Sequence, residues 1–303
     1  PLSWWDIDMP PEDWVKEAEA SLQRGYTTFK MKARPWRDIH DQVATVGKVV
    51  PDDYRFDIDF NGFLLTSARA EEELSKLDGV LHAGMYESPF YLYKDLTGAR
   101  TLRERVRKPI VEHFRDEVLH AHASDGFVIG GTINSMRHQA SLAAGFNKPF
   151  WLQLVGAGPT TAFALHFGSV LSHAQLPYIT CHELFESDLL TKRIEIVDGY
   201  GTIPEGPGLG VEVDAAAIER YRVDPQEPTP KQRYRQLKRI LHVRWPSPSA
   251  QRTWSFTDEG HYQAAFYAGS LPGFQQGVHL DVEEDDGSAS FSTAHAALVA
   301  KGL

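Results

Sequence analysis

Apolar and polar residues alternate with two different periods along the first 210 residues of the chain. Short runs rich in β-branched and aromatic residues, such as Tyr-Thr-Thr-Phe-Lys-Met-Lys at 26–32, are typical of strands. Longer stretches with apolar residues at helical spacing follow these runs. The pattern predicts eight strands, at residues 2–5, 26–32, 54–59, 85–87, 109–112, 127–129, 150–154 and 178–181.

Seven helices are predicted between these strands, at residues 10–24, 38–50, 67–77, 95–106, 116–124, 135–144 and 160–172. Strands that alternate with helices of this length indicate parallel βαβ units, and eight such units fit a (β/α)8 TIM-type barrel. A doubly wound open sheet is the alternative, but its first strand is usually followed by a glycine-rich phosphate loop, which Trp-Trp-Asp-Ile-Asp at 4–8 is not. We therefore expect an α/β barrel over residues 1–223.

The character of the sequence changes after residues 214–221. Residues 224–231 (DPQEPTPK) are typical of a linker, residues 231–244 are basic, and the rest is aromatic and rich in turns. So many aromatic side chains on a solvated tail would expose a large apolar patch. We therefore expect residues 224–303 to form an extension packed on the barrel or on a partner subunit, with the acidic run 283–286 in solvent.

Composition narrows the class of protein. The chain has 303 residues, 42% hydrophobic residues and a formal net charge of −10, which is typical of a folded globular protein and argues against nucleic acid as a partner. Its single cysteine, Cys181, excludes an internal disulfide framework. There is no apolar run long enough to span a membrane and no signal peptide at the start. These observations favour a cytoplasmic protein that acts on small molecules.

Ionisable residues stand at the carboxyl ends of four consecutive predicted strands: Lys30 and Lys32, then Asp59, Glu87 and Glu112. In a barrel these ends share one mouth. Three carboxylates there would repel each other unless they bound a cation, and Mg²⁺ takes oxygen ligands. The two lysines share one face of their strand, and close cations lower each other's pKa, so one of them could act as a base. The pattern predicts a Mg²⁺ site beside a lysine base.

Several short motifs point to one family. They are Phe-Lys-Met-Lys (29–32), Asp-Phe-Asn-Gly (59–62), Tyr-Glu-Ser-Pro-Phe (86–90), Glu-His (112–113), Gly-Gly (130–131) and Ile-Pro-Glu-Gly-Pro-Gly-Leu-Gly (203–210). In this order the chain, over about residues 1–214, resembles the barrel domain of the mandelate racemase and muconate-lactonizing branch of the enolase superfamily. The capping domain that precedes the barrel in this family is not in the chain.

The resemblance implies Mg²⁺-dependent removal of the proton α to a substrate carboxylate, the metal stabilising the resulting enediolate. It implies Lys32 as the base, Lys30 as a charge-neutralising neighbour, and Glu183 as the group that hydrogen-bonds the substrate carboxylate. The family's second base is missing. On strand six its position holds glycine, or Asp125 if the double glycines are aligned, and on strand seven Gln153 replaces a histidine.

One base favours one-sided chemistry, so we expect dehydration of a hydroxy acid such as an acid sugar. A racemase or epimerase of the same superfamily, and a non-catalytic barrel serving as a binding or assembly subunit, stay open as alternatives. Asp125, His113 and His182 are candidates for the general acid. Asp59 alone could instead be a turn residue before Asn61. We also expect a homo-oligomer, because a barrel without its cap would otherwise leave its mouth uncovered.

Overall fold

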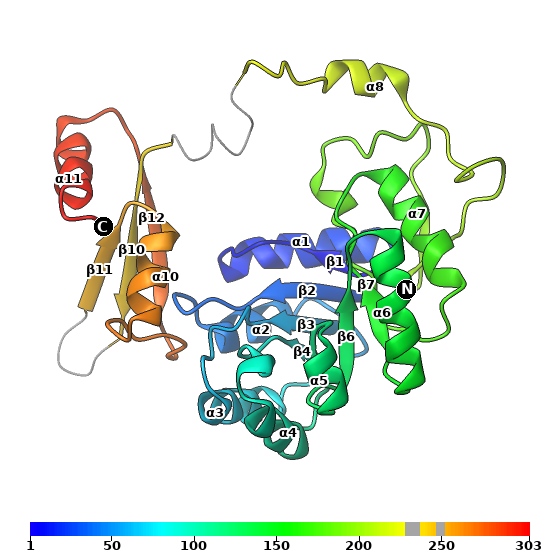
Figure 1. Cartoon of the computed structure of the whole chain (residues 1–303). Helices are drawn as coiled ribbons and strands as arrows, with labels where there is room; N and C mark the ends of the chain where they lie inside the picture. Colours follow the sequence, from blue (N-terminus) through cyan, green and yellow to red (C-terminus); the bar gives the residue numbers. More distant parts are fainter. Residues whose placement is uncertain (228–236, 247–251) are drawn as a thin grey trace. The chain divides into compact units, whose positions relative to one another are not determined.

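The computed structural model describes residues 1–227, 237–246 and 252–303 (Figure 1). Contacts divide the chain into two compact units. The first consists of residues 1–33 and 43–220, and the second of residues 34–42 and 221–303. The predicted linker and the basic stretch after it fall partly outside the described residues.

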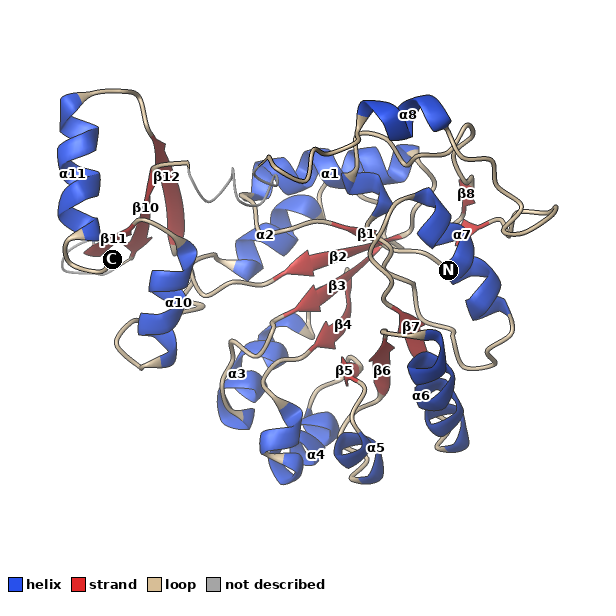
Figure 2. Cartoon of the chain, turned by 45° about the horizontal axis from the view of Figure 1, so that its top comes forward, coloured by secondary structure: helices blue, strands red, loops and turns tan. Residues whose placement is uncertain are grey.

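The first unit is built on a parallel sheet of seven strands, which follow one another in the sheet in chain order. They are β1 (Trp4–Trp5), β2 (Thr28–Lys32), β3 (Arg55–Asp59), β4 (Ala83–Glu87), β5 (Ile110–His113), β6 (Gly126–Ile129) and β7 (Phe150–Leu152). The sheet is curled, with helices around its outer side (Figure 2). The prediction of an α/β fold with parallel βαβ units is confirmed.

The eighth predicted strand is not a strand of this sheet. It forms only isolated parallel bridges, between Tyr178 and Leu2 on one side and between Ile179 and Gln153 on the other. Its extended backbone ends at Cys181, where φ is 56°, in the left-handed region. The prediction of eight regular strands was therefore wrong in this detail, because no two consecutive residues here pair with the same neighbouring segment.

Helices connect the strands at the predicted places. They are α1 (Pro11–Gln23), α2 (Ile39–Val46), α3 (Ser67–Leu77), α4 (Leu96–Arg105), α5 (Asp116–His120), α6 (Ile133–Gly145), α7 (Gly158–Ser169) and α8 (Ala215–Arg220). Short 3₁₀ turns η1 (Leu92–Lys94) and η2 (His182–Leu184) and a hairpin of β8 (Ile196–Val197) and β9 (Tyr200–Gly201) complete this unit. Helices α3, α4 and α6 start where the side chain of Thr66, Asp95 or Thr132 accepts a hydrogen bond from a backbone N–H three residues on. Helix α5 is shorter than predicted.

Alternation along β2 and β3 places the charged groups. Phe29 and Met31 are fully buried, and successive side chains of a strand point to opposite faces. Lys30 and Lys32 therefore share the face opposite to these apolar side chains. Lys32 lies directly beside Asp59 in the register of the two strands. The local sequence thus fixes which face of the sheet carries the ionisable residues.

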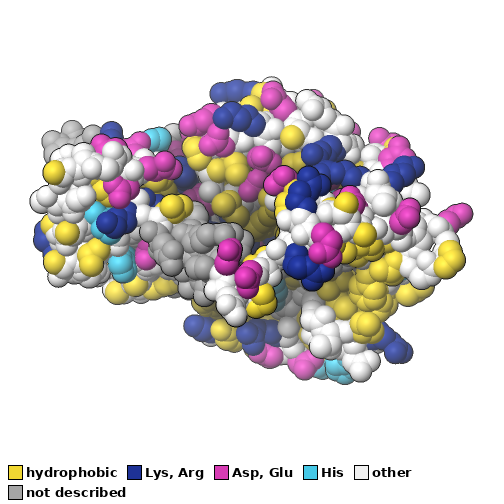
Figure 3. Space-filling view, turned by 90° about the horizontal axis from the view of Figure 1, so that it is seen from above, with side chains coloured by type: hydrophobic (Ala, Val, Ile, Leu, Met, Phe, Trp, Pro, Cys, Tyr) yellow, Lys and Arg dark blue, Asp and Glu magenta, His cyan; other side chains and the backbone are white. Residues whose placement is uncertain are grey.

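Figure 3 shows one face, on which lysine and arginine side chains are interspersed with acidic ones and hydrophobic side chains lie between them. Among the described residues no helix combines the length and the hydropathy needed to cross a bilayer.

The second unit contains a three-stranded antiparallel sheet in the order β11–β10–β12. Its elements are β10 (Arg239–Trp245), β11 (Arg252–Phe256), α10 (Glu259–Tyr267), β12 (His279–Glu284) and α11 (Ala289–Val299). Of its aromatic side chains, Phe256, Tyr262, Phe266 and Phe291 are buried. Residues 283–286 are exposed, as expected for the acidic run.

The segment 34–42, which follows β2 directly, belongs to this second unit. The Trp36 ring meets the Tyr262 ring edge-on, with centroids 5.6 Å apart. The backbone N–H of Gly277 donates to Asp38 Oδ2 at 2.6 Å, and that of Phe274 donates to the carbonyl oxygen of Pro35 at 3.2 Å. The predicted extension, residues 224–303, is therefore only part of this unit, which also includes residues 34–42.

Replacing Trp36 with alanine is expected to destabilise the second unit. Trp36 is 4% exposed, and removing a buried tryptophan side chain typically lowers the free energy of unfolding by about 3–5 kcal/mol. Urea unfolding followed by near-ultraviolet circular dichroism measures this loss. Val299→Ala, at a position 55% exposed in α11, is the control and should cost less than about 0.5 kcal/mol. Equal midpoints for the two variants would contradict this packing.

Candidate active site

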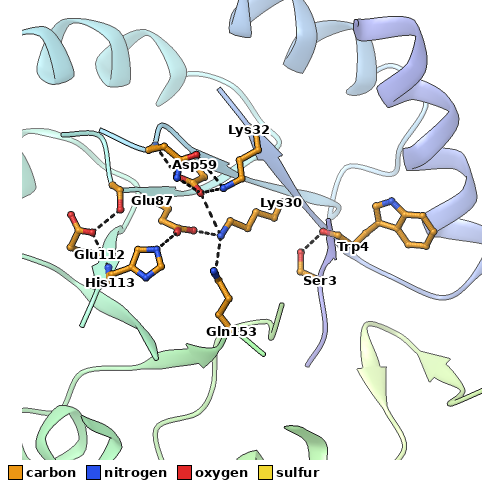
Figure 4. Close-up of polar contacts among 11 residues, drawn as sticks. Ser3, Trp4, Lys30, Lys32, Asp59, Glu87, Glu112, His113 and Gln153 are labelled. Atoms are coloured by element: carbon orange, nitrogen blue, oxygen red, sulfur yellow. Dashed lines mark hydrogen bonds and ion pairs between the residues drawn. The ribbon is translucent and has the colours of Figure 1, made fainter. Parts of the chain in front are cut away.

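Lys30 lies at the centre of a cluster of buried ionisable groups at the carboxyl ends of the strands. It is 1% exposed, and its Nζ pairs with Glu87 and lies 3.6 Å from Asp59 Oδ2. On the side away from the carboxylates, Nζ donates to Gln153 Oε1 at 3.3 Å and lies 5.2 Å from the centre of the Trp151 ring. Figure 4 shows this lysine between Glu87 and Gln153. Its ammonium group is therefore enclosed on several sides.

Lys32 occupies a more open position. Its Nζ pairs with Asp59 and donates to Asn61 Oδ1 at 3.2 Å, and its side chain is 15% exposed. Asp59 also accepts from the backbone N–H of Asn61 at 2.8 Å. Asn61 and Gly62 have positive φ, of 45° and 80°, which this tight turn requires. Asp59 thus closes the turn and also faces the two lysines.

Glu87 and Glu112 follow on the next two strands. Glu87 is 1% exposed, and its Oε1 lies 3.3 Å from Nε2 of His113. Glu112 accepts from the hydroxyl of Ser88 at 2.7 Å and from the backbone N–H of His113 at 2.9 Å. The structure therefore brings Asp59 and Glu87 together around Lys30, while Glu112 lies beside them on Ser88.

Proton affinities in the cluster follow from burial and charge. Burial alone would lower the pKa of Lys30, but the carboxylates of Glu87 and Asp59 outweigh it and the pKa lies above its usual value. Burial opposes ionisation of Asp59, yet the two lysines hold its pKa at about 2. Burial raises the pKa of Glu112, and contact with Glu87 raises that of His113. The cluster is strongly charged and largely removed from water.

The donor set fits a hard cation. Asp59, Glu87 and Glu112 offer carboxylate oxygens from three adjacent strands, which is the ligand type that Mg²⁺ prefers. Neither oxygen of Glu87 accepts a hydrogen bond of good geometry, so this buried carboxylate relies on ion pairs alone. Within the described ranges, no three His, Cys, Asp or Glu side chains converge as a ready-made metal group. Instead, the ammonium groups of Lys30 and Lys32 form ion pairs with Asp59 and Glu87.

A cavity of about 140 Å³ lies next to Lys32. Apolar side chains from β1, from the end of β7 and from the segment around η2 form most of its wall, and Lys32, Gln153 and Cys181 complete it. The Trp5 ring centre is 5.8 Å from Lys32 Nζ. Burial raises the pKa of the Cys181 thiol to about 11, so the thiol is neutral. Of the two lysines, Lys32 is the one that borders this space.

Most of the chain is similar to known proteins. A family model described as "Enolase C-terminal domain-like" matches residues 13–217. A mandelate racemase/muconate lactonizing family protein from Azoarcus sp. EbN1 superposes with a TM-score of 0.63 at 25% identity, over 75% of this chain and 66% of that one. The chain belongs to the enolase superfamily, in its mandelate racemase and muconate-lactonizing branch.

Curated relatives within the superfamily carry out different reactions. D-gluconate dehydratase from Thermoproteus tenax is 25% identical over 252 residues, which cover 74% of this chain and 49% of the relative. Muconate cycloisomerase 1-1 from Acinetobacter lwoffii is 26% identical over 246 residues, covering 74% and 62%. The chain therefore spans about half to three fifths of the length of these relatives, and their names describe different reactions.

The structure does not place Glu183 with the lysines. Its carboxylate pairs with Arg24, lies 3.1 Å from Nη1 of Arg193 and accepts from the Tyr26 hydroxyl at 3.3 Å. These partners come from the end of α1, the start of β2 and the loop after η2. In this member of the superfamily the residue thus belongs to a separate charged group.

Of the three candidate acids, only His113 contacts the carboxylate cluster. Asp125 stands before β6, where it binds the guanidinium of Arg103 and accepts from the backbone N–H of Ile110 at 2.9 Å. The Asp125 side chain therefore fixes the start of β5. His182 is buried beside Glu183 instead.

Two residues at the site, Asp57 and Trp5, were not predicted from the sequence. Asp57 lies on the same face of β3 as Asp59, opposite Lys30 in the strand register, and burial raises its pKa to about 7. The alternation Asp-x-Asp in Arg-Phe-Asp-Ile-Asp was the signal that could have revealed it. Trp5 borders the cavity, and nothing local in the sequence marks it, because most of its neighbours there come from residues 153–185.

The environment of His182 predicts a pH-dependent stability. Burial, together with Arg193 and Arg24, outweighs Asp188 and lowers the pKa of His182 from 6.5 to about 4. Between these values the unfolded chain binds the proton and the folded chain does not, so stability falls as the pH falls from 6.5 towards 4. From pH 7 to pH 4.5 this loss is roughly 2–3 kcal/mol.

His182→Gln is expected to lack this loss, because glutamine stays neutral. Urea midpoints of the wild type and the variant at pH 7 and pH 4.5 isolate the difference from all other titrating groups. His138→Gln, at an exposed position on α6, is the control and should keep the wild-type pH dependence. A parallel pH dependence in the wild type and His182→Gln would refute the assignment.

Proposed function

We propose that the chain catalyses Mg²⁺-dependent abstraction of the proton α to a carboxylate, followed by loss of a β-hydroxyl group as water. The position of Lys32 is the observation that carries this proposal. It borders the cavity, whereas the ammonium of Lys30 is enclosed by Glu87, Asp59 and Gln153. A base has to reach its substrate. Lys32 is therefore assigned as the base.

Asp59, Glu87 and Glu112 are the proposed ligands of the metal. A bound Mg²⁺ would supply a Lewis acid that holds the substrate carboxylate and offsets the charge developing on it. Lys30, buried between two of the ligands, would add positive charge at the same place. Glu183 has no part in this proposal, since its carboxylate is paired with arginines.

The reaction needs one proton removed and one supplied. The α-proton goes to Lys32, the electron pair of the C–H bond forms the C=C bond, and the β-hydroxyl leaves with a proton as water. His113, half exposed and in contact with Glu87, is the proposed donor of that proton. Gln153, on the other side of Lys30, has no proton to accept or lose near neutral pH. This asymmetry favours elimination over racemisation, which needs a base on each face.

Proton exchange in heavy water tests the proposal. The probes are D-gluconate, whose dehydratase is one of the relatives, and 3-hydroxy-3-phenylpropanoate, which would give cinnamate and water. With Mg²⁺, NMR should show loss of the α-proton signal and formation of the dehydrated product. This product is cinnamate for the phenyl compound and, after the enol ketonises, a 2-keto-3-deoxy acid for D-gluconate. A chelator should prevent both changes. No exchange with either probe, at protein concentrations where Mg²⁺ binding is saturated, would favour the non-catalytic alternative. Exchange without elimination would favour a racemase.

A further inference from the structure

The wall of the cavity beside Lys32 carries information about the substrate. Five apolar side chains contribute to it: Trp5, Val155, Ile179, Leu184 and Phe185. Ile179 is buried, whereas Val155 is 63% exposed and Leu184 and Phe185 are each 44% exposed. Apolar surface left exposed around a cavity next to a catalytic group is surface that a ligand can cover.

The polar groups of this wall are few, and two of them already have partners. Lys32 is held by Asp59 and Asn61, and Gln153 accepts from Lys30. The Cys181 thiol is a weak hydrogen-bonding group. A polyhydroxylated chain placed here would exchange its hydrogen bonds to water for contacts with hydrocarbon, which is unfavourable.

The position of the cavity relative to the proposed metal ligands also favours an apolar substrate group. The proposed metal ligands lie on β3, β4 and β5, whereas the cavity is formed by residues of β1, of the end of β7 and of the segment after it, with β2 and its lysines between them. A substrate whose carboxylate faces the ligands would therefore direct the rest of its structure across Lys32 into the apolar cavity.

We infer that the substrate is a carboxylate with a compact apolar group beyond its reacting carbons, and that this group fills the cavity next to Lys32. The inference rests on the proposed function and names its substrate class. The volume of about 140 Å³ sets the size, because an apolar cavity of roughly 150 Å³ accepts benzene. A phenyl or branched aliphatic group fits this volume, whereas an acid sugar would be the alternative substrate class that the test below compares with it.

Calorimetry in the presence of Mg²⁺ tests the inference directly. 3-Hydroxy-3-phenylpropanoate should bind at least about tenfold more tightly than 3-hydroxybutanoate, which has the same reacting atoms with a methyl group in place of the phenyl, and than D-gluconate. D-gluconate binding as tightly as the phenyl compound would overturn the inference. Absence of any preference for phenyl over methyl would also overturn it.

Substitutions in the cavity wall test whether the phenyl group binds there. Leu184→Gln with Phe185→Gln should weaken binding of 3-hydroxy-3-phenylpropanoate by about tenfold and leave 3-hydroxybutanoate within about twofold. The matched control is Leu81→Gln with Val170→Gln, two exposed apolar positions away from the cavity, at 56% and 78% exposure, and it should change neither affinity. Equal weakening by both pairs would show that the phenyl group binds elsewhere and would overturn the inference.

The outcome is separable from that of the proposed function. If D-gluconate binds more tightly and exchanges its α-proton, the proposed chemistry stands and the inferred substrate class fails. If the phenyl compound is preferred and the cavity variants abolish the preference, while the wild type exchanges no α-proton, the cavity assignment stands and the proposed chemistry fails.

Discussion

Replacing Lys32 with methionine is expected to slow exchange of the substrate α-proton by about 10³-fold, because a positioned base typically contributes 10²–10⁴-fold. Methionine keeps most of the length of the side chain beside Trp5 and removes only the ammonium group that Asp59 and Asn61 hold. Mg²⁺ affinity, measured by calorimetry, should be retained. Exchange is followed by NMR in heavy water with 3-hydroxy-3-phenylpropanoate or D-gluconate.

Lys76→Met is the matched control for this experiment. Lys76 is 52% exposed on α3, where it pairs with Glu72, so its loss should leave exchange within about twofold of the wild type. If the Lys32 variant still exchanges within tenfold of the wild type, the base is another residue. Lys30→Met is then the next variant to measure, since Lys30 is the nearest alternative on the same face of β2.

Removing a proposed metal ligand should have the second large effect. Glu112→Gln is expected to lower Mg²⁺ affinity by more than about 100-fold, since even residues that only orient ligands contribute 10–100-fold. Glutamine can still accept from the Ser88 hydroxyl and the His113 N–H, so the local fold should persist. Calorimetry measures the affinity. Glu73→Gln, a buried carboxylate on α3 outside the cluster, is the control and should bind Mg²⁺ as the wild type does.

Asp59→Asn tests the same metal site and is also expected to lower the stability of the fold. Asp59 is fully buried and pairs with both lysines, so the variant leaves two ammonium groups with less compensating charge. Breaking a buried ion pair by removing one partner typically costs about 3–5 kcal/mol of folding free energy. Asp59→Asn should therefore lose both Mg²⁺ affinity and stability, whereas Glu112→Gln loses mainly affinity. Unchanged affinity in both variants would disprove the ligand assignment.

Much of the site could be predicted from local sequence. Lys30 and Lys32 share a face because a strand alternates, and Asp59 and Glu87 come after strands of one parallel sheet, whose carboxyl ends meet at one edge. The βα alternation itself, and the helix starts at Thr66 and Thr132, follow from short-range periodicity and capping. Strand alternation, helix periodicity and helix capping all depend on residues a few positions apart.

Contacts between distant parts of the chain could not be predicted in this way. Glu183 stands at the right place in the sequence for a substrate ligand, yet its partners are two arginines, of which Arg24 lies at the end of α1. Trp36 follows β2 but packs on Tyr262, more than two hundred residues later. Whether a charged or aromatic side chain finds such a partner depends on packing, which leaves no periodic signal in the sequence.

The sequence by itself determined the family, the order of the parallel strands and the face that carries the lysines and carboxylates, because backbone period and motif spacing are local properties. Only the tertiary structure decided that seven strands form the sheet, that Lys32 rather than Lys30 borders a cavity, and that this cavity is apolar. Its wall joins Trp5 with residues from positions 153–185. Such a surface exists only after the two ends of the barrel unit have been brought together, since no single segment contains it.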